Sequence, residues 1–209
     1  MTHLLGGWLF CMCAQPLIAA SAGRPAWRRA LWVYLFGVSS MFFASSSYHM
    51  LPLGSEWRGV FWYLDHGAIW LCIASTITCV HVIACKPRRA YLIAVWVAAL
   101  GGACLELIWL SRLPPWVSPL AYVAMGWLGT FPLLELWRRH GKGAAAPILS
   151  GGVIYTLGGA ADALEWPNFG PNLGSHETLH VMVLGGTAFF WLVVHQAMLR
   201  EAEVLQEEG

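Results

Sequence analysis

The chain has 209 residues, of which 58% are hydrophobic and only 11% charged, whereas an ordinary soluble domain carries roughly a quarter charged residues. This composition excludes an ordinary soluble domain and indicates an integral membrane protein. The formal net charge of +1 comes without a basic stripe, which argues against a nucleic-acid partner.

Seven apolar runs are each long enough to cross about 30 Å of hydrocarbon, which takes roughly 20 residues in an α-helix. Transmembrane strands need only about ten residues, so the runs predict helices. The breaks carry glycine, proline or charged residues, and none could hold a soluble domain. We therefore expect an all-α, seven-transmembrane-helix bundle forming one domain over residues 1–200, with helices at 3–21, 29–50, 59–84, 90–110, 116–137, 145–165 and 176–199. A short acidic tail at 201–209 is expected to extend the last helix as an amphipathic helical segment.

The first run lacks the basic segment that precedes the apolar part of a signal peptide, so we interpret it as a retained helix, with cleavage as the alternative. The six cysteines lie in or beside apolar runs without a paired pattern. They are interpreted as small hydrophobic residues rather than as disulfides or zinc ligands.

Basic residues are unevenly distributed among the predicted loops. Nine lysines and arginines lie in or beside the first, third and fifth loops, whereas Arg58 and Arg112 are the only ones in the second and fourth, and the sixth has none. Cytoplasmic loops carry the excess of positive charge in membrane proteins. The pattern predicts an N-terminus outside and a C-terminus in the cytoplasm.

Histidines at the predicted helix ends are the strongest candidates for a site. His176 and His180 are four residues apart, so their rings share one face of a helix. His49 ends the second predicted helix, one turn after Ser45, and Asp65 lies near the start of the third. Because successive helices alternate in direction, all of these side chains are expected at the same membrane surface.

Three neutral imidazoles and one open position are a known arrangement for catalytic zinc, and no cysteine lies at this depth. Each residue also has an ordinary interpretation: His49 as a helix-end histidine, Asp65 as a capping carboxylate, and the histidine pair as an interfacial polar face. Their shared depth favours a metal site.

Other polar residues are weaker candidates. His66, Tyr155, Asp162 and Glu177 are secondary site residues, with His66 in a packing role and Glu177 supporting the start of the last helix. Histidines without partners in this scheme are interpreted as interfacial or loop residues; they are His3, His81, His140 and His195.

Four segments resemble the bacterial hemolysin III proteins of the progestin and adipoQ receptor family, within the wider superfamily that includes alkaline ceramidases. The segments occur in the family's order across nearly the whole chain; they are Ser45-Ser46-Ser47-Tyr48-His49, Leu64-Asp65-His66-Gly67-Ala68-Ile69, Gly151 to Gly159, and His176-Glu177-Thr178-Leu179-His180-Val181. The resemblance implies a Zn²⁺ ion held by His49, His176 and His180. It also implies that Ser45 and Asp65 lie near a bound water, and that the protein resides in the bacterial inner membrane.

The leading hypothesis is a zinc-dependent hydrolase of a lipid amide or ester, with Asp65 and Ser45 as catalytic residues and membrane lipids as partners. The alternative is a non-enzymatic sensor, receptor or cytolytic pore with a structural zinc. A third hypothesis is a proton- or ion-linked transporter that uses Glu106, Asp162 and Glu165. In adiponectin receptors the zinc lies toward the cytoplasm, whereas the charge pattern here places the site toward the outer leaflet.

Overall fold

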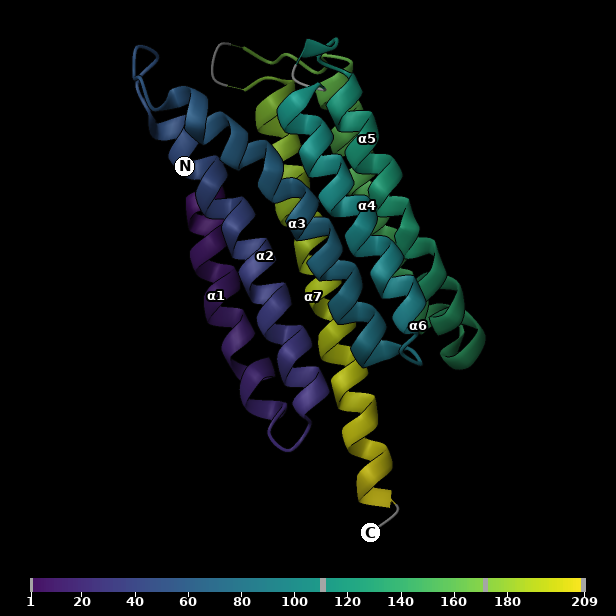
Figure 1. The fold of residues 1–209 in the computed structure, drawn as a ribbon. Helices are drawn as coiled ribbons and strands as arrows, with labels where there is room; N and C mark the ends of the chain where they lie inside the picture. The colour runs from purple at the N-terminus through teal and green to yellow at the C-terminus, as the bar shows by residue number, and fades with distance from the viewer. Residues whose placement is uncertain (1, 110–111, 171–172, 208–209) are drawn as a thin grey trace.

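A computed structural model of the protein describes residues 2–109, 112–170 and 173–207, and its helices lie side by side in one bundle (Figure 1). Within these residues the only β-type pairing is an isolated bridge between Gly170 and Leu173. The helices are α1 (Thr2–Ala20), α2 (Pro25–Met50), α3 (Arg58–Ala84), α4 (Arg89–Ile108), α5 (Val117–Gly126), the 3₁₀-helix η2 (Trp127–Gly129), α6 (Thr130–Ala163) and α7 (Ser175–Glu207).

Two helix ends differ clearly from the predicted membrane spans. α2 begins at Pro25 rather than at residue 29, because proline in the first turn needs no N–H partner and has its φ angle preset for a helix. α7 continues to Glu207, past the end of the last predicted membrane span at 199; this confirms the expected helical extension, since residues 200–207 contain no glycine or proline and several strong helix formers. Residue 110 of the predicted fourth helix and residues 208–209 of the predicted tail lie outside the described residues.

The predicted fifth and sixth helices belong to one nearly continuous helical segment, Val117–Ala163. A straight helix would separate Trp127 from Thr156 by about 43 Å, yet Trp127 Nε1 donates a hydrogen bond to Thr156 Oγ1 at 3.1 Å. The chain reverses at Gly141, whose φ of 82° and ψ of 178° lie outside the helical region (Figure 1). The break between the two predicted helices, expected over residues 138–142, therefore consists of a single residue with non-helical backbone angles, Gly141.

Six helical segments of the described chain are long and apolar enough to cross a membrane, because Val117–Ala163 counts as one segment. The expectation of seven crossings requires that both arms of this segment cross, and it stays a prediction. The sides of the bundle expose large apolar residues such as Met12, Phe36 and Val97, each more than 60% exposed. Soluble monomers rarely expose apolar patches of this extent. The fold is therefore that of a multi-pass helical membrane protein.

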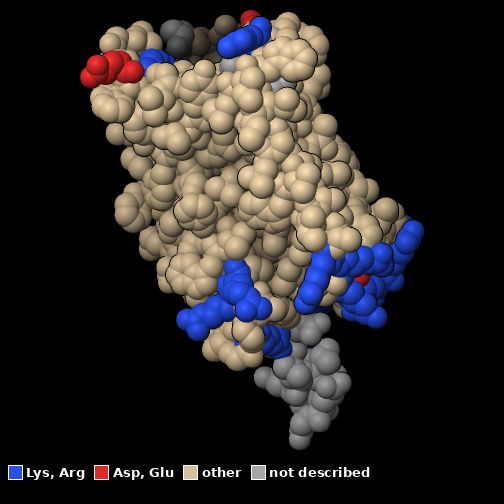
Figure 2. Space-filling model, viewed as in Figure 1, with Lys and Arg blue, Asp and Glu red and all other residues tan. Residues whose placement is uncertain are grey.

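Charge is concentrated at one end of the bundle. Figure 2 shows lysine and arginine gathered at the lower end of the view, an uncharged band above them, and a few acidic and basic residues at the upper end. The lower end contains the start of α2, the α3–α4 connection and the reversal at Gly141. The end of α2 and the start of α7 lie at the opposite end of the molecule.

Glycines allow two helix pairs to pack closely. On α2, a Cβ atom at Gly37 would collide with Ser75 and lie 3.0 Å from the carbonyl oxygen of Leu71, so α2 and α3 are in close backbone contact. Between α6 and α7, a Cβ atom at Gly158 would lie 2.9 Å from the Cβ of Met182. Small residues at helix contacts let backbones approach in this way.

His81, expected at an interface or in a loop, is fully buried near the end of α3, so that prediction is wrong. Its Nε2 accepts a hydrogen bond from the backbone N–H of Arg88 at 2.9 Å. Glu135 Oε1 accepts one from the backbone N–H of Lys86, also at 2.9 Å. These two hydrogen bonds hold the α3–α4 connection against the end of the bundle.

His81, Cys85 and Glu135 bring possible metal-ligand atoms within 4.8 Å of one another. However, the imidazole lone pair at Nε2 is already used by Arg88, and Glu135 lies 3.9 Å from the guanidinium of Arg139. The Cys85 thiol in turn lies 3.7 Å from the carbonyl oxygen of Pro132, to which it donates. We therefore interpret this group as structural.

The contact at Gly37 generates a stability prediction. Replacing Gly37 by alanine should lower the free energy of unfolding by about 1–3 kcal/mol, because the Leu71 carbonyl cannot move away without separating α2 from α3. The measurement is thermal unfolding of the purified protein in detergent. Gly101→Ala on α4 is the matched control, since a Cβ atom there meets nothing within 4 Å. Equal melting temperatures for the two variants would contradict the close contact.

Candidate metal centre

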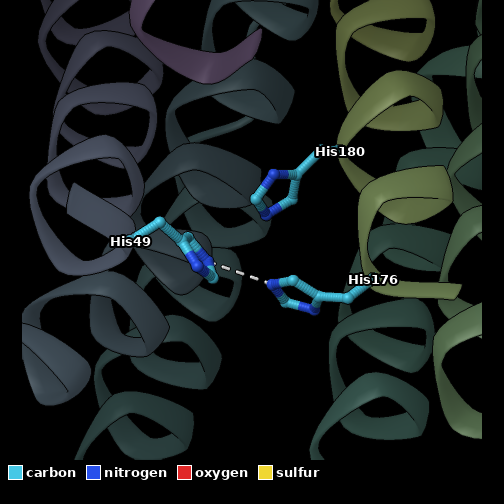
Figure 3. Close-up of side chains that lie close together, drawn as sticks. All are labelled: His49, His176 and His180. Atoms are coloured by element: carbon cyan, nitrogen blue, oxygen red, sulfur yellow. Dashed lines mark hydrogen bonds between the residues drawn. The ribbon is translucent and has the colours of Figure 1, made fainter. Parts of the chain in front are cut away.

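Three histidines meet at the end of the bundle opposite the basic cluster. His49 lies in the last turn of α2, and His176 and His180 lie in the first two turns of α7. Figure 3 shows the rings pointing into one shared space, and their candidate ligand nitrogens all lie within 4.8 Å of one another. His49 is exposed and the other two are half-buried, so the group is accessible to water.

The hydrogen bonds of His176 determine which of its nitrogens is available to a metal. Nδ1 lies 3.1 Å from Oδ1 of Asp162, and a carboxylate only accepts, so Nδ1 carries the proton. In the neutral ring Nε2 then holds a lone pair, and it lies 3.0 Å from Nε2 of His49. Two nitrogens at this distance need a proton or a cation to bind both.

The donor set fits zinc. Nitrogens bound tetrahedrally at 2.0–2.1 Å lie about 3.3 Å apart, close to the spacing of the His49 and His176 nitrogens. The contact between Asp162 and His176 is the arrangement by which carboxylates orient metal-ligating histidines. Ligation by His180 as well would leave a fourth position open, which is the pattern of catalytic sites.

Asp65 and Ser45 lie beside the histidines. Asp65 is 6% exposed, and its Oδ2 lies 3.9 Å from Nε2 of His49. Ser45 is 2% exposed and lies beside Asp65. The structure therefore places all five sequence-predicted site residues at one end of the bundle, contributed by α2, α3 and α7.

The secondary candidates have distinct positions. Asp162, at the end of α6, contacts His176 directly. His66 stacks on Trp62 with ring centroids 4.0 Å apart and bonds to the Trp62 carbonyl, in keeping with a packing role. Tyr155 lies deeper, where its hydroxyl is 2.9 Å from that of Thr187.

Glu177 lies next to the site but its side chain turns toward the start of α7. Its Oε2 accepts a hydrogen bond from the backbone N–H of Gly174 at 2.8 Å. A negative charge at this position also favours the helix N-terminus. Its role is the helix-supporting one expected from the sequence.

His3 was expected to be interfacial and without partners, and this prediction is wrong. It is only 4% exposed, its Nδ1 lies 2.9 Å from Ser45 Oγ, and its ring stacks on that of His180 with centroids 3.8 Å apart. The alternation of helix direction could have predicted this position, because it makes α1 begin at the same end of the bundle as α3 and α7. His140 is exposed, and His195 is half-buried and stacks on Trp191, both away from the site.

The acidic residues proposed for a transporter do not form one path. Glu106 is fully buried and accepts a hydrogen bond from Ser118 at 2.8 Å. Asp162 is engaged by His176, whereas Glu165 is exposed just beyond the end of α6. No observation here favours the transporter hypothesis.

A cavity of about 660 Å³ opens beneath the histidines. On α3 it is lined from Asp65 to Ile77, a stretch of about 18 Å along the helix axis. Polar side chains are concentrated near the site, while the deeper lining is mainly apolar, including Ile77, Leu133, Ile148 and Phe190. The cavity can hold an elongated apolar group with one end at the histidines.

Comparison with known proteins places the chain in a family. The sequence profile of the family described as Haemolysin-III related matches residues 1–191. Hemolysin-3 of Bacillus cereus is 33% identical over 140 residues, which cover 65% of this chain and 60% of the relative, somewhat under two thirds of its length. A Hemolysin-3 homolog of Bacillus subtilis (strain 168) is 26% identical over 164 residues, covering 77% of this chain and 74% of the relative. The chain therefore belongs to the hemolysin III-related family.

Proposed function

We propose that this protein is an integral membrane, zinc-dependent hydrolase acting on an amide or ester of a lipid. The observation that carries the proposal is the convergence of His49, His176 and His180 at the mouth of a deep apolar cavity, with a buried carboxylate beside them. A metal site at a membrane surface and a slot for an apolar chain together fit a lipid substrate.

Zinc, when bound, lowers the pKa of a coordinated water to about 7 and polarises a substrate carbonyl. Imidazole also suits copper, nickel and iron, but zinc commonly takes three histidines with an open position. His49, His176 and His180 are the proposed ligands. Asp162 holds the ring of His176 in the tautomer that ligation requires.

The remaining site residues have separate proposed roles. Asp65 accepts the proton of the attacking water, for which its position 3.9 Å from the His49 nitrogen is suitable. Ser45 lies beside Asp65 and orients this carboxylate; once Asp65 has accepted the proton of the water, the Ser45 hydroxyl turns to the developing oxyanion. The apolar cavity along α3 excludes water from the lipid chain.

The proposed membrane arrangement has seven crossings, with the two arms of Val117–Ala163 counted separately. Both arms pack against each other as far as Trp127 and Thr156, which supports two antiparallel crossings. The basic end of the bundle then lies in the cytoplasm of a bacterial cell, at the inner membrane, and the histidine site faces the outer leaflet.

The name Hemolysin-3 of the relatives points to the competing hypothesis, a cytolytic or sensing membrane protein with a structural zinc. A conducting path needs polar lining at several depths. Here the deeper lining of the cavity is mainly apolar, which favours the hydrolase over a pore.

Metal content tests the site itself. Elemental mass spectrometry of the detergent-purified protein should find about one zinc per chain. A His176→Ala/His180→Ala variant that still unfolds cooperatively should lose it, because two of the three ligands are gone. His195→Ala, which removes a half-buried histidine far from the site, should keep the zinc. Absence of metal from the folded parent protein would rule out the hydrolase.

Replacing Asp65 by asparagine tests the reaction. The variant should keep its zinc, since Asp65 is not a proposed ligand, while hydrolysis of a fluorescent lipid amide or ester should fall by about 10²–10⁴-fold because the proton acceptor is lost. Zinc content and hydrolysis rate are measured on the same preparation. Zinc retained with no hydrolysis of any lipid by the parent protein would favour the sensing alternative.

The number of crossings determines whether the two ends of the chain share a membrane side. Seven crossings place them on opposite sides, whereas six place them on the same side. An epitope tag at the N-terminus should therefore be accessible to antibody on intact spheroplasts, and a tag at the C-terminus only after permeabilisation. Equal accessibility of both tags would contradict seven crossings.

A further inference from the structure

His3 connects α1 to the metal centre, although the proposed reaction assigns it no role. It lies in the first turn of α1 and lines the same cavity as the three histidines. Its side chain contacts both a proposed catalytic residue, Ser45, and a proposed ligand, His180. A histidine that is 4% exposed in an apolar bundle requires specific partners.

The contact with Ser45 has a defined direction. Ser45 lies beside Asp65, and an ionised carboxylate can only accept, so we infer that the Ser45 hydroxyl donates to Asp65. The Ser45 oxygen then accepts the proton on Nδ1 of His3, at 2.9 Å. The resulting chain runs from His3 through Ser45 to Asp65, which itself lies 3.9 Å from the His49 nitrogen.

The imidazole of His3 is also fixed by rings on two helices. It stacks on His180 of α7, with centroids 3.8 Å apart and an interplanar angle of 24°. It meets the edge of Phe42 on α2 at a centroid distance of 5.2 Å and an angle of 69°. The direction of its Nδ1–H bond is therefore set by packing rather than by the hydrogen bond alone.

We propose that His3 is a positioning residue of the metal centre, which acts by holding the Ser45 hydroxyl toward Asp65. The inference rests on the proposed function, because it assumes that the three histidines bind a metal. Groups that contact metal ligands and orient them typically change the metal affinity by about 10–100-fold when they are replaced, and the chain from His3 reaches the proposed ligand His49 through Asp65.

Two substitutions separate the hydrogen bond from the packing. His3→Phe keeps a ring between Phe42 and His180 but removes the donor. His3→Asn removes the ring but places an amide N–H close to the position of Nδ1–H. If His3 acts by positioning Ser45, His3→Phe should weaken metal binding, whereas His3→Asn should preserve it. If His3 only fills space, the order is reversed.

The probe is Co²⁺, whose affinity is measured by chelator competition and whose visible spectrum reports the geometry of the site. We expect His3→Phe to weaken Co²⁺ binding by about 10-fold and to change the spectrum, while His3→Asn stays within about 3-fold of the parent. Ser45→Ala should resemble His3→Phe, and the double variant should show no further loss, because both changes break the same chain.

Melting temperature and gel filtration in detergent verify that each variant is folded, and Ser45→Ala removes the same hydrogen bond should His3→Phe not fold. His195→Asn is the matched control and should bind Co²⁺ like the parent. A parent that binds Co²⁺ with His3→Phe unchanged overturns the positioning role alone. A folded parent that binds no Co²⁺ overturns the proposed function, and the role of His3 with it.

Discussion

Hydrocarbon offers no hydrogen bonds, so polar side chains inside this bundle must satisfy one another. Around the histidine site most of them do so: Asp162 binds His176, His176 meets His49, and Ser45 lies between His3, to which it hydrogen-bonds, and Asp65. Each pair comes from different helices. The cost of leaving any of these groups unpaired is what makes the helix arrangement at this end specific.

The same requirement determines which nitrogen of His176 is available to a metal. Because Asp162 accepts a hydrogen bond from one His176 nitrogen, which keeps its proton, the other nitrogen is free to act as a ligand. Because Asp65 is not involved in that contact, it remains available for proton transfer. In the proposed reaction the two carboxylates therefore have different tasks, Asp65 lying near His49 and Asp162 near His176.

Sequence reasoning predicted the apolar helices, since a run of about 20 apolar residues has few other structures open to it. It also brought His49, Asp65 and the α7 histidines to one surface, because alternation of helix direction needs no side-chain detail. It did not predict the contacts of His3 or the burial of His81. These depend on the rotation of each helix about its axis, which is set by packing that involves the glycines at close helix contacts.

The close approaches at Gly37 and Gly158 divide the bundle into two tightly packed pairs, α2 with α3 and α6 with α7. His49 and Asp65 belong to the first pair, whereas His176, His180 and Asp162 belong to the second. The site thus lies between two pairs of closely packed helices. The distance between the two helix pairs therefore sets the spacing of the candidate ligand nitrogens, and a metal ion bound by His49 and the α7 histidines would link one pair to the other.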